Sequence, residues 1–190
     1  MIFRRGGWLY IDNKNIHVVT EMTYEFVFKD AFMDLRKTYI QETQTKEEIL
    51  LYPRWSFPNG KYSFFVEEEE YKAISTKENV IYNVFIVYHS DGSGIARVKS
   101  VPLLKKESMF KELHLVYGQN SYVIKTTLAF KNITISKDEE KIIMTANKVP
   151  SIYKSILSMY DYNVHVHDTL DLPFVVWVAI FKGVALLMRH

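Results

Sequence analysis

The chain contains no cysteine and few residues that break regular structure. Its 190 residues include only 7 glycines and 5 prolines. Without cysteine there can be no disulfide, no thiolate nucleophile and no zinc site with cysteine ligands. Because disulfides are rare in the reducing cytosol, their absence fits a cytoplasmic location. Arg4 and Arg5 interrupt the stretch that would have to be apolar in a secretion signal, so we expect no such signal.

The sequence also lacks strong signals for nucleic-acid binding and for catalysis. A formal net charge of only +2 and the absence of an aromatic–basic motif argue against nucleic acid as a partner. No Gly-x-Ser-x-Gly elbow is present, and the glycines of 92–94 are not followed by the Lys-Ser/Thr of a phosphate loop. We therefore expect a protein that is not an enzyme and that uses no cofactor.

Aromatic residues, in contrast, are abundant. They make up 15% of the chain, with 13 tyrosines and 12 phenylalanines, and such side chains pack well on a pleated, half-buried surface. Strand-like runs separated by polar turns predict an antiparallel meander. The expected strands are 8–11, 16–19, 23–28, 80–88, 95–101, 112–117, 121–130, 133–135, 141–146, 153–159 and 162–167. Residues 31–51 mix the two periodicities, and we predict a helix or a helix-containing segment there.

The chain closes with a segment that is apolar on every side. Asp171 is a suitable N-cap and Pro173 a suitable first-turn residue for a helix over 172–188. A helix of this kind must be buried in a membrane or in protein. Its apolar body spans only about 23 Å, and Lys182 near its middle would cost roughly 2.5–3.5 kcal/mol in a bilayer. We therefore expect a barrel closed around the helix, with Lys182 extending its stem to emerge at one side.

The end of the chain resembles a known family. The strand Tyr162-Asn-Val-His-Val-His167, the short acidic loop and the hydrophobic helix are similar to the closing segment of the tubby C-terminal-like superfamily. That superfamily includes LURP-one-related proteins, phospholipid scramblases and short bacterial members. The resemblance implies a mainly β fold, a closed antiparallel barrel of about twelve strands around a buried helix at 172–188. It implies one domain over 1–190, with 31–70 as a candidate insertion. Lys182 departs from the short bacterial members, which often carry an acidic residue in this helix.

The resemblance also carries an expectation about function. Its eukaryotic branch is linked to the binding of membrane lipids through basic residues on the barrel surface, so we expect a non-catalytic binding module for anionic lipid or a protein partner. Such a module would be cytoplasmic and peripheral to the membrane. Near a membrane surface each lysine contributes about 1 kcal/mol. The lysines that could converge on a headgroup are Lys105, Lys106, Lys111, Lys125 and Lys131.

Two other functions remain open. His165 and His167 occupy alternate strand positions, which places both imidazoles on one face beside Asp168 and could support a small metal-dependent hydrolase. Because Val164 and Val166 form the apolar face, the alternative is that the histidines are simply solvated. A third hypothesis is a structural or regulatory protein whose barrel presents loops to a partner. The acidic run 67–70 is expected to be a solvated loop rather than a cation site.

Overall fold

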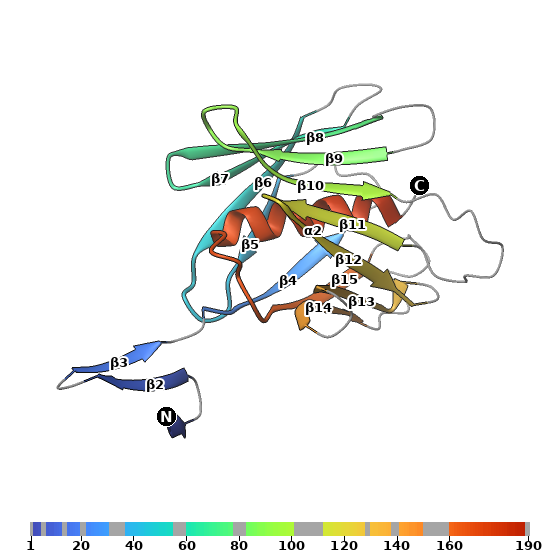
Figure 1. Ribbon diagram of the computed structural model, residues 1–190. Coiled ribbons are helices and arrows are strands. Elements are labelled where there is room, and N and C mark those ends of the chain that lie inside the picture. The colour runs from blue at the N-terminus through green and yellow to red at the C-terminus, as the bar shows by residue number, and fades with distance from the viewer. Residues whose placement is uncertain are drawn as a thin grey trace.

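The computed structural model describes residues 2–4, 7–12, 15–19, 22–30, 37–54, 60–77, 83–100, 112–127, 130–137, 141–149 and 160–188 (Figure 1). These residues form two antiparallel sheets and a C-terminal helix. The smaller sheet has three strands in the order β1 (Ile2–Arg4), β2 (Gly7–Asp12) and β3 (Asn15–Val19).

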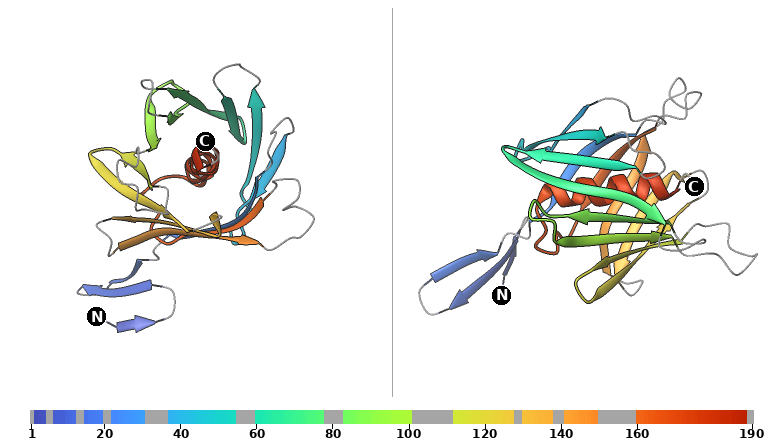
Figure 2. Two further views of the ribbon diagram at one scale, coloured as in Figure 1. Left: turned by 90° about the vertical axis from the view of Figure 1, so that its right-hand side faces the viewer. Right: turned by 90° about the horizontal axis from the view of Figure 1, so that it is seen from above.

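The larger sheet has twelve strands and curls into a nearly closed barrel (Figure 2). It runs in the order β4-β15-β14-β13-β12-β11-β10-β9-β8-β7-β6-β5, so that every neighbour except the β4–β15 pair is also consecutive in the chain. The mainly β barrel fold predicted from the sequence is therefore confirmed. The strands are β4 (Tyr24–Asp30), β5 (Thr38–Gln41), β6 (Glu48–Arg54), β7 (Lys61–Val66), β8 (Glu69–Lys77), β9 (Asn83–Tyr88), β10 (Gly94–Ser100), β11 (Glu112–Tyr117), β12 (Asn120–Thr126), β13 (Asn132–Lys137), β14 (Lys141–Val149) and β15 (Tyr160–Val166).

Alternation of buried and exposed residues explains why these segments are strands. On β12, Tyr122, Ile124 and Thr126 are buried while the residues between them face outward. On β15, Val164 and Val166 are buried in the same way. Side chains of a strand point alternately to opposite faces, so each strand supplies one apolar row to the interior and one polar row to the outer wall.

Helix α2 (Phe174–Met188) lies in the centre of the barrel (Figure 2). Every residue of α2 except Leu186 is buried. The ring of Phe181 packs edge-to-face against Phe28 and Tyr162, with centroid distances of 5.0 and 5.5 Å. Trp177 donates from its indole nitrogen to the carbonyl of Thr169 at 2.9 Å. The sheet has a large interior because it has twelve strands, and α2 fills that interior with side chains.

The wall closes between β4 and β5 with a single β-bridge, Phe26 to Glu42, instead of a ladder. Glu42 is buried, and its carboxylate supplies the acceptors that the missing ladder would supply. The amide of Glu25 on β4 donates to Oε1 at 3.0 Å, and the amide of Gln44 donates to Oε2 at 2.6 Å. The amide and hydroxyl of Thr45 also donate to Oε2. One side chain therefore joins the two ends of the twelve-stranded sheet.

Three expectations about local structure are corrected. Residues 38–41 and 48–54 are β5 and β6, so the predicted helix is wrong for the described part of 31–51; residues 31–36 lie outside it. The central helix begins at Phe174 rather than at residue 172. Pro173 occupies the N-cap position, because its carbonyl accepts the hydrogen bond from the Val176 amide at 3.0 Å. Asp171 lies in the preceding turn with a φ of 58°. Lys182 does not emerge, because it is 1% exposed.

Inside the barrel, the Lys182 ammonium lies over an aromatic ring. Its Nζ lies 5.2 Å from the centroid of the Tyr62 ring, which attracts a cation through its quadrupole. Strands β5 to β7, which contain Tyr62, are integral parts of the wall. Whether 31–70 is an insertion relative to other proteins stays a prediction. The predicted strand 153–159 lies outside the described residues.

Candidate functional site

Helix α2 fills the described part of the barrel interior with buried side chains, and most of the described charged side chains lie on the outer wall and at the two ends. Because the sheet is a meander, alternate connections lie at the same end. One end is where α2 begins, and it holds the β5–β6, β7–β8, β9–β10 and β11–β12 turns (Figure 1). The other end is where α2 stops.

Lysines gather at the end where α2 stops. We call this set the basic rim, and most of its members are exposed, with Lys99 and Lys148 half-buried. Three carboxylate residues of the described ranges share this end, Asp30, Glu112 and Asp161, and Asp161 is the one whose side chain the structure describes. The basic rim consists of Lys29, Lys37, Lys61, Lys77, Lys99, Lys125, Lys131 and Lys148.

Members of the basic rim are close enough to influence one another. Burial lowers the pKa of Lys148, and the neighbouring charge of Lys131 lowers it further. The backbone also brings these two residues together, because the Lys148 amide donates to the Lys131 carbonyl at 2.8 Å. Lys131 and Lys148 are therefore neighbours whose positive charges act on each other, although burial is the larger cause of the lowered pKa.

Carboxylates gather at the opposite end, where α2 begins. We call this set the acidic rim: Glu25, Glu42, Glu47, Glu48, Glu67, Glu68, Glu69, Glu70, Asp91, Asp168 and Asp171. Burial raises the pKa of Glu47, and the charges of Glu42 and Glu67 raise it further. The two rims match the macrodipole of α2, whose positive N-terminus faces the carboxylates and whose negative C-terminus faces the lysines.

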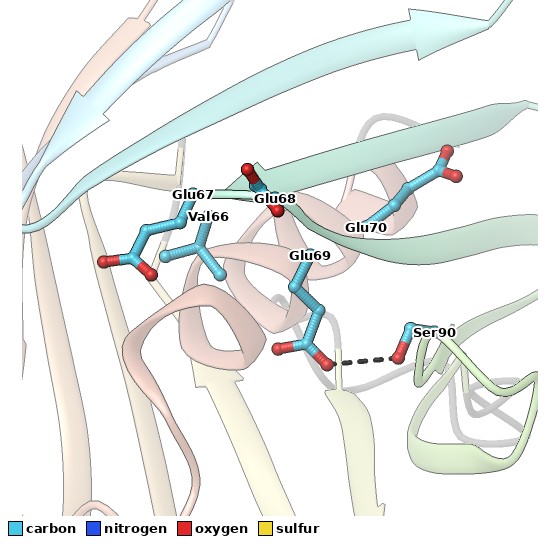
Figure 3. A pocket seen from close by; sticks show the side chains of 6 residues that line it. All are labelled: Val66, Glu67, Glu68, Glu69, Glu70 and Ser90. Carbon is cyan, nitrogen blue, oxygen red and sulfur yellow. Dashed lines mark hydrogen bonds between the residues drawn. The ribbon is translucent and has the colours of Figure 1, made fainter.

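The acidic rim contains a shallow hollow of about 500 Å³ beside the β7–β8 turn (Figure 3). It is lined by Val66, Glu67, Glu68, Glu69, Glu70 and Ser90. The Glu69 carboxylate accepts a hydrogen bond from the Ser90 hydroxyl at 3.1 Å. The four carboxylates point in different directions in Figure 3, so they do not converge on one cation. Glu70 instead accepts from Arg54 at 2.7 Å on the outer wall.

The structure places only part of the predicted lipid site. Lys125 ends the exposed row of β12 opposite Glu112 of β11, and Lys131 is exposed just before β13, so both belong to the basic rim. Lys105, Lys106 and Lys111 lie outside the described residues. The strand ends that flank their segment, Ser100 and Glu112, are at the basic end of the barrel.

His165 on β15 and His167 just after it have partly exposed or exposed side chains. Their rings stack with centroids 6.4 Å apart. His167 Nε2 lies 2.9 Å from the Thr145 hydroxyl, and His165 Nε2 lies 3.7 Å from a carboxylate oxygen of Glu25. Burial lowers the pKa of His167, and the nearby His165 lowers it further.

Asp168 does not turn toward the histidine pair. Its carboxylate pairs with Lys141 and accepts the Leu170 amide at 2.9 Å. Burial opposes ionisation of Asp168, but these hydrogen bonds together lower its pKa. Within the described ranges, no three histidine or acidic side chains come together in a geometry that could hold a metal ion.

Sequence reasoning missed most of the two rims. The sequence does contain a signal for the rims. In a meander, alternate connections lie at the same end of the sheet, so adding the charges of alternate connections gives the net charge of each end. Adding the charges along the whole chain hides this difference, because the two ends cancel. Without the correct β5 and β6 strands the alternation could not be followed through the first third, so Lys37 and Lys61 could not be assigned to an end.

Comparisons with known proteins do not assign the chain to a family. No protein-family model, no curated protein sequence and no solved structure matches this chain. The resemblance to the tubby C-terminal-like superfamily therefore stays a prediction. Among the residues that the structure describes, no helix has both the length and the apolar character needed to cross a membrane.

Proposed function

We propose that this protein is a non-catalytic binding module whose basic rim docks on the anionic headgroups of a membrane surface. The observation that carries the proposal is the separation of charge between the two ends of the barrel. A positive rim attracts anionic lipid, while the acidic rim at the other end is repelled and points away. Anionic lipids are abundant in the cytoplasmic leaflet, so the proposed location is cytoplasmic and peripheral to the membrane.

Two features of the barrel support binding rather than catalysis. The described part of the interior is occupied by the buried residues of α2 rather than by polar groups arranged around a reaction site. The described polar clusters are also internally satisfied, as the pairing of Asp168 with Lys141 shows. The metal-dependent hydrolase remains a less favoured hypothesis, because His165 and His167 belong to no group of three possible metal ligands among the described residues.

The test is co-sedimentation with vesicles of phosphatidylcholine, with and without phosphatidylserine or a phosphoinositide, at low and near-physiological salt. We expect binding that requires the anionic lipid and weakens with salt, since surface charge is screened within about 8 Å at physiological ionic strength. Two rim variants, Lys37→Glu/Lys61→Glu and Lys125→Glu/Lys131→Glu, reverse the same amount of charge on opposite sides of the rim. At least one should weaken binding by about tenfold or more.

The matched control is Lys72→Glu/Lys137→Glu, which reverses the same charge outside the basic rim. Lys137 is the more instructive member, because it ends β13 at the acidic end whereas Lys131 precedes the same strand at the basic end. This control should bind within about twofold of the unmodified protein. If neither rim variant weakens binding, or if binding ignores lipid charge, the proposal is wrong.

A further inference from the structure

An exposed aromatic surface lies beside one part of the basic rim. On β5 and β6, the buried residues Ile40, Ile49 and Leu51 face α2, so their neighbours face outward. Tyr39 is 63% exposed and Tyr52 is 39% exposed, which is unusual for side chains of this size. Together with the half-buried Leu50 and Phe65 they form what we call the aromatic face.

Register places these four side chains at neighbouring positions on the outer wall. Tyr39 pairs with Leu50, and Leu50 pairs with Phe65, which gives one row across β5, β6 and β7. Tyr52 follows Leu50 by two residues on the same side of β6, and so lies diagonally next to Tyr39. The result is a continuous apolar strip on the outer wall.

Two cations of the basic rim lie beside one end of the aromatic face. The Lys37 ammonium lies 5.1 Å above the ring of Tyr52, and Lys61 is exposed next to the end of β6. Arg54 is neutralised by its 2.7 Å contact with Glu70, so the excess charge beside this face comes from the two lysines. Tyrosine rings with hydroxyl tips and flanking lysines match the headgroup layer of a membrane, where one end of the side chain is apolar and the other wet.

We propose that the aromatic face inserts its tyrosine rings into the headgroup layer of an anionic bilayer, so that the barrel docks on its β5–β6 side. This inference rests on the proposed function and adds the side of contact and the residues that make it. Charge complementarity favours a lipid surface as the occupant, because Lys37 and Lys61 border the face on the side of the basic rim. The carboxylates that border it are Glu70, which is paired with Arg54, and Glu48, which lies toward the acidic rim. Lys125 on β12 and Lys131 just before β13 lie on another side of the barrel wall, and they then contribute less than Lys37 and Lys61.

The absence of cysteine permits a direct test. A Tyr39→Cys variant of the full chain carries a single thiol for an environment-sensitive nitrobenzoxadiazole label. The matched control is Ile142→Cys, since Ile142 is also exposed, at 48%, but lies near the acidic end of β14. With vesicles containing phosphatidylserine, the label at position 39 should shift its emission to the blue and be quenched by spin-labelled lipid. The label at position 142 should remain unchanged.

Unlabelled variants give a second readout. Tyr39→Ser/Tyr52→Ser should weaken vesicle binding by about tenfold, whereas Ile142→Ser should have little effect. Circular dichroism confirms that each variant is folded. Vesicle binding with the position-39 label still in water, or with the tyrosine variant unaffected, would overturn this inference and leave the proposed function standing. Failure of the unmodified protein to bind any anionic vesicle would overturn both this inference and the proposed function. In that case, binding of another soluble protein to the aromatic face would identify the face as a protein interface.

Discussion

At the scale of single residues, the close approach of α2 to the wall depends on Gly183. A Cβ built at this position would lie 2.4 Å from Cδ1 of Phe85 on β9, closer than any real contact. Glycine is therefore required by the packing of the buried helix against the sheet rather than by an unusual backbone angle. Lys182 next to it shows a second adaptation, because its buried ammonium is placed over the ring of Tyr62.

We predict that Gly183→Ala destabilises the fold by about 1–3 kcal/mol, because overpacking must displace the Phe85 ring or the helix. Urea denaturation followed by circular dichroism measures the free energy of unfolding. Gly94→Ala is the control, since a Cβ there meets nothing within 4 Å. In a Phe85→Leu background the cost of Gly183→Ala should fall. A Gly183→Ala protein as stable as the unmodified one would contradict this packing.

At the scale of the elements, the junction of β4 and β5 is the weakest line in the barrel wall. The other neighbouring strands are joined by ladders, while these two share the bridge at Glu42 and the hydrogen bonds of its carboxylate. The Thr43 amide adds a bond to the Glu25 carbonyl at 2.7 Å. Burial opposes ionisation of Glu42, but the donors from Glu25, Thr45 and Gln44 together lower its pKa.

We predict that Glu42→Ala lowers the free energy of unfolding by about 3–5 kcal/mol, because it leaves buried amides without an acceptor. Glu42→Gln should cost less. Because the pKa of Glu42 is lower in the folded state, its contribution is fully present above the unfolded value of roughly 4.3 and is lost as the pH falls through the folded value. The stability difference between the unmodified protein and Glu42→Gln should therefore shrink in acid.

Urea titrations over a series of pH values check this expectation. The control is Glu48→Gln, because Glu48 is exposed on the outer face of β6 a few residues away. A difference between Glu42→Gln and the unmodified protein that does not change with pH would show that the carboxylate does not hold the junction.

The elements also show how far sequence reasoning reaches. The terminal helix was predictable because its residues are apolar on every side, and its predicted start was wrong by two residues only because Asp171 forms a turn before the cap. Strands from β9 onward were predictable from alternation and turn residues. The stretch that became β5 and β6 was mistaken for a helix because Tyr39 and Ile40 are adjacent apolar residues, and only the structure shows that Tyr39 is exposed.

The candidate site was less predictable than the fold, for a physical reason. The basic rim is assembled from strand ends far apart in the chain, such as Lys29 and Lys148, so its existence depends on strand order and on which connections share an end. A charge count along the sequence does not contain this information. Lys125 and Lys131 were predicted because they lie on or just after the strand adjacent to the connection with Lys105, Lys106 and Lys111, and the rim they belong to is wider than that set.

At the scale of the whole molecule, two properties reinforce each other. Helix α2 fills the described part of the barrel interior, and the proposed binding surface lies on the outside. The same helix aligns its dipole with the separation of charge, positive N-terminus to acidic rim and negative C-terminus to basic rim. A molecule of this kind approaches a charged surface with one end preferred. The buried helix is therefore the premise of both proposals about function.

Native-state hydrogen exchange, resolved along the chain by mass spectrometry, tests that premise most directly. Amides of α2 should be among the slowest in the protein, exchanging only on global unfolding, because the helix is enclosed by the wall. Amides beside the β4–β5 junction should exchange sooner. If the amides of 174–188 instead exchange rapidly under conditions in which the barrel strands are protected, the helix does not reside in the barrel, and the account given for this protein is contradicted.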